Sequence, residues 1–175
     1  WGETLAFDPA FVFSPGDEIV FVPAASNVST TAGGCIDFQL HGERFGVSGE
    51  FWIAQAAGTY FVAVLQTLNP ATGDGIRSIG GWAEAYYKLN EYTTCYVGYG
   101  IDDPRNQDLG FLTDPVDPED PGQRNLNQVV WASVLWDVTD FFQLGFEVSH
   151  RETHYVNPFA STDGILYHFR SSLNY

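Results

Sequence analysis

The last segment of the chain, residues 163–175, alternates between apolar and polar side chains. In a β-strand, successive side chains point to opposite faces. One face of such a strand would hold Ile165, Tyr167, Phe169, Leu173 and Tyr175, and the other would hold His168, Arg170, Ser172 and Asn174. A membrane β-barrel explains this pattern physically, because one face of each strand meets lipid and the other meets a water-filled lumen. Edge strands of soluble sheets imitate the alternation, so the rest of the chain has to decide.

The same period of two recurs upstream and predicts about eight strands. The expected strands are residues 1–7, 34–41, 45–54, 79–89, 92–100, 127–136, 140–151 and 163–175. Aromatic residues make up 16% of the chain, with 18 glycines and 9 prolines, a composition that favours strands and turns. No stretch approaches the ~18 continuous apolar residues of a membrane helix. We therefore predict an all-β fold over a single domain, residues 1–175: an antiparallel up-and-down transmembrane β-barrel.

The expected connections alternate in length. Short turns are expected near 42–44, 90–91 and 137–140, and long loops at about 8–33, 55–78, 101–126 and 152–162. Short turns on one rim and long loops on the other are typical of outer-membrane barrels. An eight-stranded barrel is filled by its own side chains. Because residues 1–7 are shorter than the roughly 9–11 residues of a spanning strand, we expect the chain to be part of a larger barrel.

Ionisable side chains of both signs share the polar faces of the expected strands. These predicted lumen-lining residues are Asp37, His41, Glu50, Glu84, Lys88, Glu147, Arg151, His168 and Arg170. In a channel they would set the ion preference, whereas in a narrow barrel they would pair across strands. The positions of Glu147, Arg151 and Arg170 on adjacent strands favour pairing. Ser149 and His150 would face opposite sides of their strand, so they cannot form a nucleophile–base pair, and we expect no enzyme activity.

The stretch 101–126 is the most acidic part of the chain. Calcium prefers six to eight oxygen ligands, and Asp102 and Asp103 are the best candidates because they end a strand. The neighbouring prolines favour a solvated loop instead, and no other cofactor is expected. The two cysteines, Cys35 and Cys95, would lie on strands with two other strands between them, a lateral offset of about 14 Å, which is too far for a disulfide. With 22 acidic and 7 basic residues, a net charge of −15 argues against nucleic acid as a partner.

Three segments resemble a family of porin-like outer-membrane proteins of planctomycetes: Gly75–Trp82, Val97–Pro104 and Leu144–Ser149. The resemblance covers residues 34–175. It implies a β-barrel in an outer membrane without catalytic residues. Members of that family are longer, so the chain would correspond to a C-terminal part.

The end of the chain also resembles the C-terminal insertion signal of bacterial outer-membrane barrels, in which an aromatic last residue follows alternating apolar residues. The matching positions are Tyr167, Phe169, Leu173 and Tyr175. This resemblance implies lipid and the barrel-assembly machinery as partners. We therefore expect a bacterial outer-membrane protein that passes small solutes or serves as a structural element of the membrane.

Two other functions stay open. One is a structural or adhesive surface protein that uses the long loops. The other is a soluble lipocalin-like binding barrel, which Trp52, Trp82 and Tyr86 on the polar face favour. A homo-oligomer or a complex with further envelope proteins also remains open.

Overall fold

The computed structural model describes residues 2–6, 27–58, 63–110 and 121–173, which are mostly β-strand with almost no helix. The strands are β1 (Gly2–Ala6), β2 (Asn27–His41), β3 (Phe45–Gln55), β4 (Arg77–Lys88), β5 (Thr93–Pro104), β6 (Arg124–Thr139), β7 (Phe142–Tyr155) and β8 (Ser161–Leu173). Two short 3₁₀ turns, η2 (Ala63–Leu65) and η3 (Asn106–Asp108), lie in the connections. Within the described ranges, no helix is long and apolar enough to cross a membrane.

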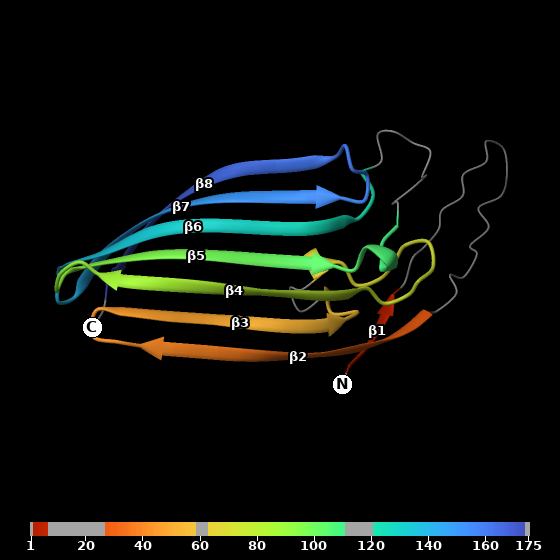
Figure 1. Cartoon of the computed structure of the whole chain (residues 1–175), viewed down its shortest axis with the longest axis horizontal. Helices are drawn as coiled ribbons and strands as arrows, with labels where there is room; N and C mark the ends of the chain where they lie inside the picture. The colour runs from red at the N-terminus through yellow and green to blue at the C-terminus, as the bar shows by residue number, and fades with distance from the viewer. Residues whose placement is uncertain (1, 7–26, 59–62, 111–120, 174–175) are drawn as a thin grey trace.

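The strands pair only with their neighbours in sequence and always antiparallel, in the order β1 to β8. Figure 1 shows β2 to β8 side by side, with the short turns gathered at one end of the sheet and the long connections at the other. The short turns join β2 to β3, β4 to β5 and β6 to β7. The predicted up-and-down topology is therefore confirmed. The connection lengths alternate as predicted except between β7 and β8, where residues 156–160 form a short connection.

The pairing register divides the side chains of the sheet into two faces. Residues that are linked by register partners from strand to strand form a row, and we call them level with one another. On one face, such a row runs across six strands through Phe45, Tyr87, Cys95, Val134, Phe146 and Phe169. We call this side the apolar face. Its side chains are uncovered by the described residues: Ile36 is 70% exposed and Phe169 is 73% exposed. The opposite side, which holds most of the charged residues of the strands, is the polar face.

Few apolar side chains are fully buried, because one layer of sheet cannot enclose a core. The buried apolar residues of the described part are Ala56, Ala57, Ala63 and Ile76, all in the connection between β3 and β4. On the polar face, aromatic rings pack on glycines instead. A Cβ added at Gly98 would lie 2.1 Å from Cζ2 of Trp131, and one at Gly80 would lie 2.3 Å from Cζ2 of Trp52. These glycines give the rings room to lie against the sheet.

The prediction of a closed barrel is wrong for the described chain, because the sheet is open. β8 pairs with β7 alone, and β1 pairs with β2 alone through Gly2–Ala6. The alternation of side chains fixes which face each residue occupies. It does not fix whether the two edge strands meet, which depends on strand number, stagger and curvature.

Four predicted loop boundaries are also corrected, and one of them is the end of β5, which runs to Pro104 rather than to 100. β2 begins at Asn27 rather than at 34, β7 runs to Tyr155 rather than to 151, and β6 begins at Arg124 rather than at 127. The long connection 152–162 thus shrinks to residues 156–160. Backbone pairing continues past the regular alternation of apolar and polar residues in each case, since the ladder needs no apolar side chain to form its hydrogen bonds. The N-terminal part of the expected loop 8–33 lies outside the described residues.

Candidate functional site: the polar face and the segment that covers it

All nine predicted lumen-lining residues lie on the polar face. Asp37 is level with Glu50, and through Trp82, Gly100 and Val129 with Arg151. His41 is level with Glu147 and His168 through Gly46, Tyr86, Tyr96 and Ser133. Glu84 lies on the row between the row of Asp37 and the row of His41. Lys88 lies on the row of Arg170, at the short-turn end. The sequence pattern alone was sufficient to group them.

The pairing partners differ from those predicted. Glu147 Oε1 lies 3.3 Å from Nδ1 of His168, the residue directly opposite on β8, and not beside either arginine. Arg170 Nη2 instead donates to Oε1 of Gln143 at 2.6 Å. Arg151 faces Val129 and Gly164 across its two ladders, so it has no acidic neighbour there. A register shift of two residues would change which charges meet and would leave every side chain on its face, so the alternation of side chains does not predict the pairs.

Acidic side chains dominate the part of the polar face formed by β2, β3 and β4. Asp37 and Glu50 are directly opposite each other, an arrangement of like charges that destabilises a sheet. Neither carboxylate makes a side-chain hydrogen bond or ion pair with any residue that the structure describes. Glu84 accepts a hydrogen bond from Nε1 of Trp131 at 2.7 Å, across the glycine of the intervening strand. These carboxylates therefore face open space beside aromatic rings.

Residues 63–76, the cover segment, fold over the long-connection end of the polar face. Its turn begins with Ala63, Val64 and Leu65, all with φ between 50° and 64°. Such values are costly for non-glycine residues, above all for β-branched valine, and persist only where neighbours fix them. The backbone N–H of Val64 donates to Oδ2 of Asp102 at 2.6 Å, and Oγ of Ser78 donates to Oδ1 at 2.6 Å. Asp102, which is 8% exposed, thus ties the cover segment to β4 and β5.

A second set of contacts ties the cover segment to β6. The side-chain amide of Gln66 accepts from N–H of Arg124 at 2.8 Å and donates to its carbonyl at 2.8 Å. Nη1 of Arg124 donates to the carbonyl of Val64 at 3.0 Å, and Nε2 of Gln123 donates to the carbonyl of Leu68 at 3.1 Å. Sequence reasoning missed these residues, because no pattern in the connection between β3 and β4 indicates that it folds inward.

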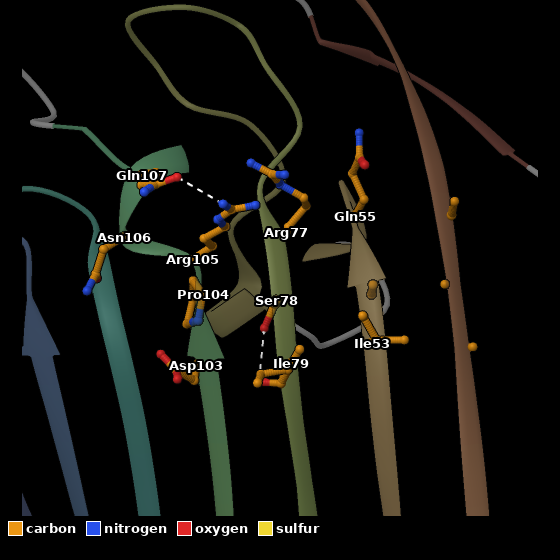
Figure 2. A pocket seen from close by; sticks show the side chains of 14 residues that line it. Ile53, Gln55, Arg77, Ser78, Ile79, Asp103, Pro104, Arg105, Asn106 and Gln107 are labelled. Carbon is orange, nitrogen blue, oxygen red and sulfur yellow. Dashed lines mark hydrogen bonds between the residues drawn. The ribbon is translucent and has the colours of Figure 1, made fainter.

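The apolar face ends in a groove of about 710 Å³ beside the long connections (Figure 2). Ile53 and Ile79 line its lower part, and Arg77 and Arg105 lie at the opposite end. Nε of Arg77 donates to Oδ2 of Asp108 at 2.6 Å. The hydrogen bonds that the Asp108 carboxyl accepts from Arg77 hold its pKa below the usual value. The groove therefore marks the point where apolar side chains give way to paired charges.

The two calcium candidates lie on opposite faces of β5. Asp102 is on the polar face, where both carboxylate oxygens already accept hydrogen bonds. Asp103 is level with Ile79 and lines the outer groove. They do not converge on one ion, and the described residues contain no group of three or more His, Cys, Asp or Glu placed to hold a metal. Calcium binding stays a prediction, with Asp114, Asp117, Glu119 and Asp120 outside the described residues.

The remaining predicted positions are placed by the register. Tyr167, Phe169 and Leu173 lie on the apolar face, and Tyr175 lies outside the described residues. Cys35 and Cys95 are free thiols on opposite faces, with β3 and β4 between their strands. Ser149 is on the polar face, whereas His150 is on the other face, 3.4 Å from Asp163.

No family model, curated protein or solved structure matches the chain. The resemblance to porin-like proteins stays a prediction.

Proposed function

We propose that the chain forms part of the wall of a bacterial outer-membrane β-barrel. In this proposal the apolar face meets lipid, and the polar face lines a water-filled passage for small solutes. The observation that carries the proposal is the oblique course of the apolar band from β3 to β7.

The upper edge of the band moves along the strands from β3 to β7. On the apolar face, the last apolar residue toward the long connections is Ile53 on β3 and Val148 on β7, where His150 follows. Val148 is level with Val47, six residues before Ile53, through Ala132, Val97 and Ala85. The edge therefore moves about 20 Å along the strands over about 19 Å across them, an angle of about 45°.

The lower edge moves in the same direction. Phe45 begins the band on β3 and is level with Phe146 on β7. On β7 the band begins four residues earlier, at Phe142. This offset of about 14 Å over about 19 Å corresponds to about 35°. If the band lies flat in a bilayer, the strands tilt by about 35–45°, the tilt of known membrane barrels.

The height of the band agrees with a bilayer as well. The nine residues from Phe45 to Ile53 span about 27 Å along β3 and about 21 Å along the membrane normal at this tilt. Outer-membrane barrels have an apolar band about 25 Å tall, bordered by aromatic residues. At the short-turn end, Phe45, Tyr87, Trp136 and Phe142 border this band.

The cover segment supports this orientation over a soluble binding barrel. A lipocalin-like barrel needs apolar side chains inside, whereas the cover segment packs on the polar face through Asp102 and Gln66. The face that the cover segment covers at one end is thus the polar face. In lipid, the free edges of the sheet also need partners, because unpaired backbone groups are costly there. The proposal therefore requires closure against further strands, from the same chain or another copy.

Reconstitution tests the proposed function. We expect the full 175-residue chain, refolded in detergent and added to planar bilayers, to produce discrete conductance steps, because the polar face gives ions a hydrated path. Heat-unfolded chain at the same detergent concentration is the control. A chain that folds and stays soluble without detergent, and that produces no conductance steps in the bilayer, would refute the proposal.

A further inference from the structure

The polar face carries more acidic than basic side chains, and the two kinds are separated. Its acidic residues are Asp37, Glu50, Glu84, Asp102, Asp137 and Glu147, and its basic residues, histidines aside, are Lys88, Arg151 and Arg170. The band from Phe45 to Ile53 and its continuation across the sheet contain no charge. The net charge of −15 is therefore confined to the polar face, the connections and the sheet ends.

The acidic residues on β2 to β4 are also the least neutralised. Asp37 and Glu50 face each other without a cationic partner among the described residues, and Glu84 has only a tryptophan N–H. The basic and imidazole groups lie mainly on β7 and β8, where His168 pairs with Glu147 and Arg170 is held by Gln143. An ion moving along β2 to β4 therefore meets carboxylates that nothing else occupies.

From this distribution, we propose that the passage prefers cations over anions. The inference rests on the proposed function and deepens it by naming the class of solute. Rows of carboxylates are how channels select cations, and walls of one sign concentrate the opposite ion. Asp37 and Glu50 are the residues that contribute most, because their like charges are uncompensated and stand on one row of the polar face.

The test measures the reversal potential of the full chain in planar bilayers of zwitterionic lipid under a KCl gradient. We expect K⁺ to be favoured over Cl⁻. The double variant Asp37→Asn/Glu50→Gln should lower the permeability ratio by more than about fivefold, because about fivefold is the Coulomb factor for one unit charge about 4 Å from an ion in water and the variant removes two. Lys88→Gln should raise the ratio, since it removes a positive charge from the same face.

The matched control is Asp163→Asn, which removes a carboxylate on the apolar-face side at the long-connection end and should leave the ratio unchanged. Conductance without cation preference, or with the same preference in the double variant, would overturn the inference and leave the proposed function standing. No conductance from folded chain would overturn both.

Discussion

Arginine in place of Ala132 should destabilise the folded chain in lipid by about 2–4 kcal/mol, the cost of a basic side chain near the middle of a membrane barrel's outer surface. Ala132 is exposed on the apolar face of β6, level with Val97 and Val148, so an arginine there would project into hydrocarbon. The free energy of unfolding is measured by denaturant titration of the chain refolded in phospholipid vesicles.

The neighbouring residue supplies the matched control. Ser133 is on the polar face, directly opposite Glu147, and arginine there would meet a carboxylate and water. Ser133→Arg should change the free energy of unfolding by less than about 1 kcal/mol, as surface ion pairs do. Equal costs at both positions would mean that the two faces do not differ in environment, and the lipid-facing assignment would fail.

Replacing Asp102 with alanine should release the cover segment from the polar face. The change removes the acceptor of the Val64 N–H and of the Ser78 hydroxyl, and hydrogen bonds to a charged group are worth about 1.5–3 kcal/mol. Chymotrypsin cleavage after Leu65 or Leu68 should then become about 10- to 100-fold faster, since cleavage follows the population of the opened segment. Mass spectrometry of the fragments identifies the cut.

Asp103→Ala is the control for this variant. Asp103 is the adjacent carboxylate on the same strand, but its side chain is on the apolar face. It lines the groove beside the long connections rather than holding the cover segment. Its replacement should leave the cleavage rate near that of the unchanged chain. If both alanine variants are cleaved at the original rate, Asp102 does not hold the segment.

The two-faced strands could be predicted from sequence because burial against lipid or protein imposes a period of two. β7 is an example: Leu144, Phe146 and Val148 alternate with Gln143, Glu147 and Ser149, and the register places the two sets on opposite faces. The short turns could be predicted because they interrupt this alternation with polar residues. The polar-face residues followed directly, since a side chain's face is set by its position in the strand.

What depends on distant parts of the chain could not be predicted. The inward fold of the cover segment depends on the meeting of Val64 with Asp102, which are 38 residues apart. The partner of Glu147 depends on the register of β7 with β8, and it is His168 rather than an arginine. Whether the two edges of the sheet meet could not be predicted either, because alternation within strands carries no information on closure.

The most direct test of the central claim, that one face meets lipid and the other meets water, uses the two native cysteines. Cys95 lies on the apolar face, level with Tyr87 and Val134, and Cys35 lies on the polar face, level with Trp52. A nitroxide label is attached to Cys95 in the Cys35→Ser variant, and to Cys35 in the Cys95→Ser variant, with the chain in bilayers. We expect the label at Cys95 to collide mainly with oxygen, which concentrates in hydrocarbon, and the label at Cys35 to collide mainly with a water-soluble nickel complex. Equal access of the nickel complex to both labels would contradict the claim.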